Sequence, residues 1–188
     1  MSVVNINENT ILEDNFSQHL DYNFELKELY GEINTPFNFI NKMLSIIPKE
    51  YFENKTLKWL DPGSGHGNYS LCLFFILFKS LIKSIPNAEE RKKHIIENMI
   101  YMIELNKDNI PFLREKFGEK GNIIEENYLE WETDLKFDFI IGNPPYNFNG
   151  VKKVPTKNNV NKKEDGKTIW CEFVKKNISL LKENGKMN

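Results

Sequence analysis

The chain begins with a polar segment and then changes to an alternation of apolar blocks and polar connections. Residues Glu13–Tyr30 show a modestly amphipathic helical pattern, so we expect residues 1–30 to form an N-terminal helical extension. A second helix is predicted by apolar residues that recur at spacings of three and four: Phe37, Ile40, Leu44 and Ile47. We expect Thr35 to cap this helix, Pro36 to take its first position and Pro48 to end it.

From residue 57 onward, short apolar runs alternate with helical patterns. The runs predict four strands: Leu57–Leu60, Ile100–Leu105, Asn122–Glu125 and Phe137–Ile141. Helices are predicted at Tyr69–Ile82 and through Ile110 to Gly118, whereas Pro86–Lys93 is only a polar, charged stretch. Strands without alternation, separated by helices, are typical of a parallel sheet that is covered on both faces. The sequence therefore predicts an α/β fold with right-handed crossovers.

The segment that follows the fourth strand has a different character. Between Asn147 and Lys167 there are six lysines against two acidic residues and no helical or strand period, which predicts a mobile basic loop. A last helix is predicted from Thr168 to Glu183, capped at Gly185. Its inward residues are expected to be Trp170, Phe173, Val174 and Leu181. Residues 31–188 are thus expected to form one domain.

Composition narrows the class of protein. A chain of 188 residues with 40% hydrophobic content is long enough for one globular core. The net charge of −2 excludes a uniformly basic coat for nucleic acid, so any DNA contact would be local. Cys72 and Cys171 form neither a CxxC pair nor a ligand spacing with histidine, so no metal site or disulfide is predicted.

No part of the sequence suggests a membrane. The N-terminus carries no signal peptide, and the apolar run Leu71–Phe78 is far shorter than the roughly 20 residues that a spanning helix needs. The sequence therefore predicts a soluble, cytoplasmic protein without a membrane partner.

A glycine-rich turn directly follows the first predicted strand. It begins with Asp61 and Pro62 and continues through Gly63 and Gly65 to Gly67. Glycines allow the backbone to turn tightly and approach a ligand at the carboxyl end of a strand. The Asp61 carboxylate would repel a pyrophosphate but suits the ammonium group of an amino-acid ligand, although a helix-capping role explains it as well.

Glu104 ends the second predicted strand. An acidic residue in that place can accept hydrogen bonds from both ribose hydroxyls of an adenosine. It lies 37 residues after Gly67, further than in dinucleotide-binding folds, and the charged stretch Pro86–Lys93 accounts for the excess.

The run Gly142-Asn143-Pro144-Pro145-Tyr146 follows the fourth predicted strand. An amine conjugated to an aromatic ring is a poor nucleophile because its lone pair is delocalised. Acceptors for both of its N–H groups oppose this delocalisation, and the Asn143 side-chain oxygen and a carbonyl held by the consecutive prolines supply two. Tyr146 offers a flat face for a planar group extruded from a duplex.

These motifs, in this order, resemble those of the amino-methyltransferases with an NPPY motif, and among them the N6-adenine DNA methyltransferases of the gamma order. The resemblance covers Gly31–Lys186. It implies a Rossmann-like methyltransferase fold, S-adenosylmethionine (S-adenosyl-L-methionine) as cofactor, and DNA with a flipped adenine as substrate.

The resemblance also implies a role for each motif. Thr35 belongs to the segment Gly31–Pro36, which in the family reaches the methionine end of the cofactor. Asp61, with Pro62, Gly63 and Gly65, matches the glycine-rich motif beside the amino-acid moiety, and Glu104 matches the ribose-binding acid. The catalytic residues implied are Asn143, Pro144 and Pro145, with Tyr146 stacking on the target base. Trp170 and Phe173 match aromatic residues near the cofactor pocket, and a core role is equally expected for them.

The sequence departs from the family in two places. After the third strand the family has Asp followed by an aromatic residue, whereas this chain has Asn127 and Tyr128. Asn127 can still accept a hydrogen bond from the adenine amine of the cofactor, but it lacks the negative charge of an aspartate. The chain also reaches the next strand of the family's sheet only at Lys186, so the resemblance implies a fold that is incomplete at its C-terminus. A downstream segment or a separate subunit would then recognise the DNA.

Two other functions are compatible with these motifs. One is a glutamine or RNA N-methyltransferase, which the Gly31–Pro36 segment and the Asp61-Pro62 pair disfavour. The other is a truncated, catalytically silent relic or partner subunit of a DNA methyltransferase.

Overall fold

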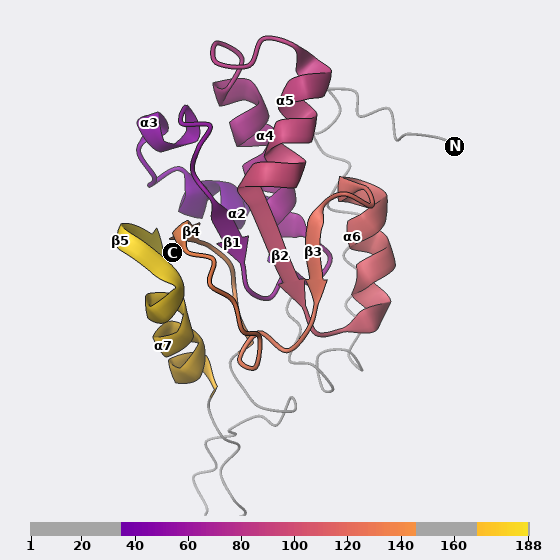
Figure 1. Cartoon of the computed structure of the whole chain (residues 1–188), viewed down its shortest axis with the longest axis vertical. Coiled ribbons are helices and arrows are strands. Elements are labelled where there is room, and N and C mark those ends of the chain that lie inside the picture. The colour runs from indigo at the N-terminus through magenta and orange to yellow at the C-terminus, as the bar shows by residue number, and fades with distance from the viewer. Residues whose placement is uncertain (1–34, 146–168, 188) are drawn as a thin grey trace, which may run out of the picture.

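Five parallel strands form one sheet in the computed structural model, which describes residues 35–145 and 169–187 (Figure 1). Their order across the sheet is β3-β2-β1-β4-β5. The strands are β1 (Trp59–Asp61), β2 (Ile100–Glu104), β3 (Asn122–Glu125), β4 (Phe137–Ile140) and β5 (Leu181–Met187). This arrangement confirms the predicted parallel α/β fold. The predicted helix at 13–30 and the basic loop at 147–167 lie outside the described residues.

The helices connect and cover these strands. They are α2 (Phe37–Leu44), α3 (Lys49–Phe52), α4 (Asn68–Ser80), α5 (Ala88–His94), α6 (Ile110–Phe117) and α7 (Trp170–Leu180), with a π-helical segment at Ile95–Met99 and a 3₁₀ turn at Lys107–Asn109. In Figure 1, α6 lies beyond β3 and α7 lies at the opposite side of the sheet, beside β4 and β5. None of the helices that the structure describes is long and apolar enough to cross a membrane.

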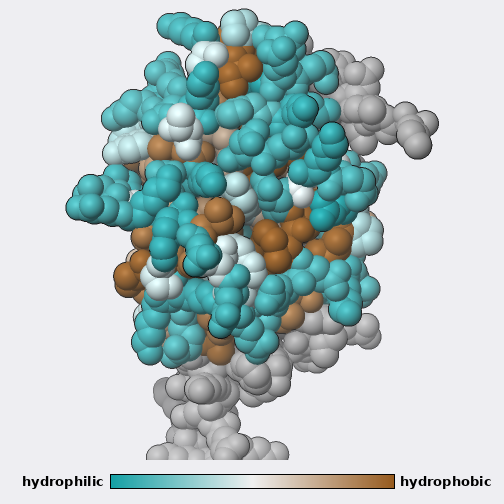
Figure 2. All heavy atoms as spheres, viewed as in Figure 1, coloured by the Kyte–Doolittle hydropathy of each residue, from teal (hydrophilic) through white to brown (hydrophobic). Residues whose placement is uncertain are grey.

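Each face of the sheet belongs to a separate hydrophobic cluster. Consecutive residues of β1, Trp59 and Leu60, are both fully buried but lie in different clusters. The cluster around Trp59 is the larger one and contains side chains of α2, α4 and α6, whereas the cluster around Leu60 contains Phe173 and Leu180 of α7. This explains why the strands read as continuous apolar runs: both of their faces are covered. On the surface shown in Figure 2, hydrophilic residues predominate and hydrophobic ones gather only in small areas.

Strand β4 contains an irregularity near its start. The N–H groups of Asp138 and Phe139 both donate to the carbonyl oxygen of Lys58, at 3.0 and 3.2 Å. Two residues of β4 therefore oppose one residue beside β1, as in a β-bulge. As a result Phe137 packs in the cluster of Leu60, while Phe139, two residues later, packs against Trp59.

Helix α5 lies where the sequence pattern predicted only a polar, charged stretch. The side chain of Asn87 caps this helix by accepting a hydrogen bond from the Glu90 N–H at 3.0 Å. Arg91 is the buried residue of α5; its guanidinium lies 4.2 Å from the Phe78 ring centroid and donates to the Ile85 carbonyl. Burial of a charged side chain on a polar helix gives no apolar periodicity, which is why the pattern did not predict it.

The prediction for the C-terminal segment was wrong in its boundaries. Helix α7 ends at Leu180, and Leu181–Met187 form β5, which pairs with β4. Gly185 does not cap a helix: it lies in the irregular part of β5, where a Cβ atom would be 3.1 Å from the Phe137 carbonyl oxygen. The strand expected to be missing is thus present among the described residues, and β4 is paired on both sides.

Helix α2 also begins differently from the prediction. Pro36, not Thr35, takes the N-cap position, and no side chain caps the helix. The helix ends at Leu44, and Pro48 caps α3. The Thr35 hydroxyl is used elsewhere, as described below.

Candidate functional site

Three predicted motifs meet at the carboxyl ends of the central strands. The Asp61–Gly67 turn leaves β1, Glu104 ends β2, and the Gly142–Pro145 segment follows β4. Because β1 lies between β2 and β4 in the sheet, these three segments are neighbours. Ligands of open α/β sheets bind at this edge.

The glycine-rich turn is tied to the end of β2 by hydrogen bonds. The Ser64 N–H donates to the Ile103 carbonyl at 3.0 Å, and the Gly65 N–H donates to Glu104 Oε2 at 2.6 Å. Gly67 then leads into α4 and donates to the Ser64 carbonyl at 2.7 Å. Glu104 therefore lies directly against the glycine-rich turn, as the predicted cofactor site requires.

Asp61 is buried at the end of β1, with 2% of its surface exposed. Its Oδ2 accepts from the Ser70 hydroxyl at 2.9 Å, whereas its Oδ1 has no hydrogen-bond partner among the described residues. Burial raises the pKa of the Asp61 carboxyl to about 7; the Ser70 hydrogen bond opposes this rise, and the nearby Glu104 carboxylate adds to it. A buried carboxylate oxygen without a donor is a costly group, and a cation would stabilise it.

Glu104 is also buried, and both of its carboxylate oxygens accept hydrogen bonds. Besides Gly65, its partners are the Asn106 N–H at 2.8 Å and the Asn109 side-chain amide at 3.4 Å. These donors orient the Glu104 carboxylate at the end of β2.

The segment after β4 lies against the Asp61 turn. Gly142 has a φ of 154°, and a Cβ atom there would be 3.0 Å from Asp61 Oδ1 and 3.3 Å from Cδ of the buried Pro62. A Cβ atom on Gly63 would lie 3.8 Å from Pro145 Cδ and 4.0 Å from the Pro144 Cα. Only glycine at position 142 permits such close approach of the segment after β4 to the Asp61 carboxylate.

Asn143 is held by a residue 108 positions earlier in the chain. Its side-chain amide donates from Nδ2 to the Thr35 Oγ1 at 3.2 Å. The Thr35 carbonyl in turn accepts from the Asn68 side-chain amide at 3.4 Å. The start of α2, the start of α4 and the segment after β4 are thereby joined, which unites Thr35 with the other predicted site residues.

The remaining predicted residues lie in different surroundings. The Asn127 side-chain oxygen accepts from the Leu129 N–H at 3.1 Å. Tyr128 is 3% exposed; its hydroxyl donates to Asn177 Oδ1 at 2.6 Å, and burial raises its pKa. Its ring packs 5.1 Å from that of Phe173, so both aromatic side chains belong to the core.

Two predicted aromatic residues remain. Trp170 at the start of α7 is 47% exposed. Tyr146 lies outside the described residues.

Several residues of the site were not predicted from the sequence. Leu105, immediately after Glu104, exposes 56% of its surface, although it is apolar. Asn106 and Asn109 are buried beside Glu104, and Ser70 donates to Asp61 from the first turn of α4. An apolar residue after a strand-ending acid, followed by asparagines, is a signal that could have indicated the first three; Ser70 carries no such signal.

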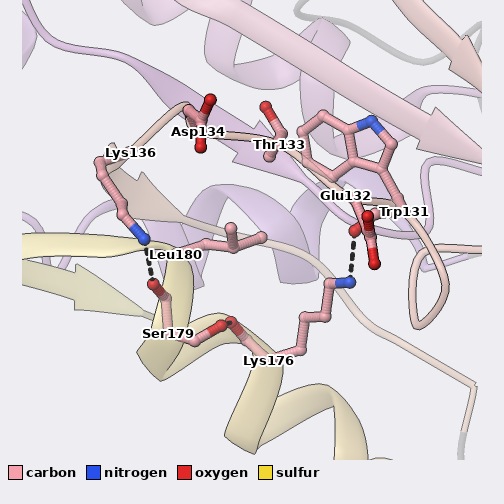
Figure 3. A pocket seen from close by; sticks show the side chains of 8 residues that line it. All are labelled: Trp131, Glu132, Thr133, Asp134, Lys136, Lys176, Ser179 and Leu180. Atoms are coloured by element: carbon pink, nitrogen blue, oxygen red, sulfur yellow. Dashed lines mark hydrogen bonds between the residues drawn. The ribbon is translucent and has the colours of Figure 1, made fainter.

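A separate hollow of about 480 Å³ lies between α7 and the segment before β4 (Figure 3). Its lining consists of Trp131, Glu132, Thr133, Asp134, Lys136, Lys176, Ser179 and Leu180. The ammonium group of Lys136 donates to the Ser179 carbonyl and that of Lys176 to the Trp131 carbonyl, so the two lysines link the walls. Lys136 precedes β4 and Leu180 precedes β5, so the hollow lies at the amino ends of the strands, away from the predicted motifs.

Comparison with known families agrees with the geometry at the carboxyl ends. The model of the Eco57I restriction-modification methylase family matches residues 5–188. The chain belongs to this family. The match covers all three motifs and both described segments of the structure.

Curated relatives carry related names but are much longer. The chain is 28% identical over 165 residues to modification methylase CviBIII of Paramecium bursaria Chlorella virus NC1A, covering 86% of this chain and 37% of the relative. It is 35% identical over 79 residues to an "uncharacterized adenine-specific methylase" of Mycoplasma pneumoniae, covering 40% of this chain and 19% of the relative. The chain thus spans well under half the length of these relatives.

Solved structures share the fold. The M protein of the type I restriction enzyme EcoKI aligns with a TM-score of 0.57 at 15% identity, over 86% of this chain and 34% of that one. A putative class I S-adenosylmethionine-dependent methyltransferase from Listeria monocytogenes aligns with a TM-score of 0.52 at 14% identity, over 86% of this chain and 49% of that one. The fold is therefore the Rossmann-like methyltransferase fold that the sequence predicted.

Proposed function

We propose that this chain is the cofactor-binding and catalytic core of a DNA methyltransferase that transfers a methyl group from S-adenosylmethionine to the N6 amine of adenine. The observation that carries this proposal is the position of the Asn143-Pro144-Pro145 segment against the glycine-rich turn, beside Asp61. An acceptor-bearing segment for an amine and an acid-rich turn for a cofactor thus share one edge of the sheet. Membership of a restriction-modification methylase family supports DNA as the substrate over RNA or a protein glutamine.

The residues at this edge fit S-adenosylmethionine. The unpartnered Oδ1 of Asp61 suits the ammonium of the cofactor's amino-acid end, because a cation there removes the cost of a buried lone carboxylate oxygen. The Glu104 carboxylate, held by the Gly65 and Asn106 N–H groups at the end of β2, is the group proposed to accept from the ribose hydroxyls. The exposed apolar surface of Leu105 lies next in the chain and suits the flat adenine ring. When bound, the cofactor supplies an electrophilic methyl group.

Other predicted cofactor contacts are kept as part of the proposal. Gly63 and Gly65 bring backbone close to the ligand beside Pro62, and Thr35 adjoins the same turn through Asn68. Asn127 has a second acceptor position on its side-chain oxygen for the adenine amine. Tyr128 would contribute through its backbone, because its side chain is used in the core.

Asn143 and Pro144 would prepare the target amine. The Asn143 Oδ1 and the Pro144 carbonyl accept the two N–H groups of the amine, which localises its lone pair on nitrogen. Proline fixes its own φ, so two in succession hold that carbonyl rigidly. Tyr146, outside the described residues, is proposed to stack on the flipped base.

Selection of a DNA sequence is proposed to need a further segment or subunit. This chain covers only 37% and 19% of the two relatives named above, so most of their length has no counterpart in it. Its net charge of −2 also gives no general attraction to DNA. Flipping a base costs a few kcal/mol of unstacking, which contacts outside this core would offset.

The proposal is tested by separating cofactor binding from methyl transfer. Asn143→Ala should reduce transfer to adenine-containing DNA by at least about 100-fold and leave S-adenosylmethionine affinity nearly unchanged, because its acceptor acts on the target amine in the transition state. Glu104→Ala should instead weaken cofactor binding about 10-fold or more, measured by calorimetry. Asn54→Ala, an exposed residue near α3, is the matched control.

Three results would contradict the proposal or redirect it. Equal cofactor affinity of wild type and Glu104→Ala would contradict the cofactor site. Retained turnover in Asn143→Ala would contradict the catalytic assignment. Cofactor binding by a wild-type chain that transfers no methyl group would favour the silent partner subunit.

A further inference from the structure

The side chain of Asn143 is an asymmetric group whose orientation decides its chemistry. One end of the carboxamide is an acceptor and the other is a two-proton donor. With the oxygen toward an amine, the group accepts an N–H; rotated by half a turn, it presents its own N–H groups to that amine and repels it. The proposed function therefore depends on which way this carboxamide points.

Thr35 is placed to fix that orientation. Its Oγ1 accepts from Asn143 Nδ2 at 3.2 Å, so the amide nitrogen is directed toward α2 and the oxygen is turned away from Thr35. Valine has nearly the shape of threonine but no acceptor. If the carboxamide rotated by half a turn, its oxygen would face Thr35, and a hydrogen bond would then form only with the Thr35 hydroxyl as the donor.

Thr35 is itself held in position. Only 8% of its surface is exposed, and it directly precedes Pro36, which begins α2. Its carbonyl accepts from the side chain of Asn68, the first residue of α4. Thr35 is thus buried and fixed at the starts of both α2 and α4, so its hydroxyl has a defined position from which to orient Asn143.

We infer that Thr35 is a positioning residue for methyl transfer: its hydroxyl holds the Asn143 carboxamide with the oxygen toward the target amine. This inference rests on the proposed function for its consequence in turnover, but the hydrogen bond and its effect on Asn143 can be measured without turnover. The role differs from the cofactor contact that the sequence resemblance implies for Thr35, because it acts through Asn143.

The test compares Thr35→Val, Thr35→Ser and the wild-type chain, with Thr133→Val as a matched control near the start of β4. The side-chain NH₂ signals of Asn143 are recorded by ¹⁵N NMR and identified by their loss in Asn143→Asp. Affinity for S-adenosylmethionine is measured by calorimetry, and kcat and KM are measured with adenine-containing DNA. Thermal melting of each variant checks that the fold is intact.

We expect Thr35→Val to shift the Asn143 NH₂ signals and increase their exchange with water, and Thr35→Ser to restore both. We expect kcat to fall about 10- to 100-fold in Thr35→Val with cofactor affinity within about 3-fold of wild type, the size for one hydrogen bond that acts in the transition state. Thr35→Ser and Thr133→Val should stay within about 3-fold in kcat.

Unchanged Asn143 signals in Thr35→Val would overturn the inference, whatever the activity. Full turnover by Thr35→Val would also overturn it, and so would a Thr35→Ser variant as impaired as Thr35→Val, since that result would mean a packing role for the γ-methyl group. A wild-type chain without methyl transfer would contradict the proposed function instead, and the NMR comparison would still decide whether Thr35 orients Asn143.

Discussion

Asp61 and Asp138 lie on adjacent strands, but near opposite ends of the sheet and in opposite surroundings. Asp61 ends β1 and is buried, with the Ser70 hydroxyl donating to Oδ2 and no partner for Oδ1 in the part of the chain that the structure describes. Asp138 lies near the start of β4, where its Oδ2 accepts from the Lys58 N–H at 2.8 Å and from the Lys182 ammonium at 2.7 Å. The first carboxylate is buried and lies near the like charge of Glu104, whereas the second accepts from a backbone N–H and from an ammonium group.

The two ends of the sheet therefore differ in how their carboxylates are stabilised. At the amino end, carboxylate, ammonium and backbone N–H satisfy one another and hold β1, β4 and β5 in register. At the carboxyl end, Asp61 and Glu104 are brought together although their charges repel. Such an arrangement reduces stability, a cost that is expected at the proposed cofactor site.

The largest expected effect follows from the Asp61 carboxyl. Its pKa is raised from 3.8 to about 7 in the folded state, so the folded protein holds a proton that the unfolded chain has lost. Its stabilising contribution is present below about pH 4 and is lost as the pH rises through about 7, by on the order of 4 kcal/mol. Asp61→Asn should remove this pH dependence, measured as the free energy of unfolding in urea between about pH 4 and pH 8.

Asp134→Asn is the control, because Asp134 is exposed beside the hollow of Figure 3 and should leave the profile as in wild type. Parallel profiles for wild type and Asp61→Asn would refute the account of Asp61 as a buried carboxyl whose ionisation destabilises the fold.

A smaller effect on the free energy of unfolding is expected at Asp138, the second of the two compared carboxylates. Asp138→Ala removes the acceptor of the Lys58 N–H, and the free energy of unfolding should fall by about 1–3 kcal/mol. Asp138→Asn keeps an acceptor oxygen and should lose less than half as much. If both substitutions cost the same in urea denaturation, the charge and not the backbone hydrogen bond would be the stabilising part.

The smallest effect is expected at Lys182. Its side chain is 41% exposed, so its ion pair with Asp138 is screened by solvent, and Lys182→Gln should cost less than about 1 kcal/mol. The difference from wild type should shrink further in about 1 M salt. A larger, salt-independent loss would show that Lys182 stabilises the start of β5 by packing instead.

The sequence predicted what depends on local pattern. Apolar runs such as that of β2 and the turn from Asp61 to Gly67 carry their own periodicity and glycines, and they form close to where they were predicted. The proximity of the turn to Gly142 followed from strand ends sharing one edge of a sheet. Helix α5 could have been found from Asn87 followed by Glu90, a capping pattern that does not need apolar residues.

What could not be predicted depends on partners distant in sequence. Leu181–Met187 contains two lysines, a glutamate and a glycine, and it forms a strand because β4 pairs with it. Thr35 looked like a helix cap because nothing nearby in sequence indicates Asn143. Tyr128 was assigned to the cofactor by its place in a motif, but a motif does not say on which side of the backbone a ring packs.

The bulge at Asp138 has a consequence for how this chain tolerates changes in length. Because it inserts one residue between Phe137 and Phe139, the side chains after it alternate in opposite phase to those before it. Deleting Asp138 would restore a regular ladder in which Phe137 and Phe139 become neighbours and keep their opposite faces, so Phe139 would stay beside Trp59 and the residues after it would keep their phase. A one-residue deletion at Asp138 is therefore compatible with the packing of both faces, whereas deletion of Ile140 would make neighbours of Phe139 and Ile141, which share one face.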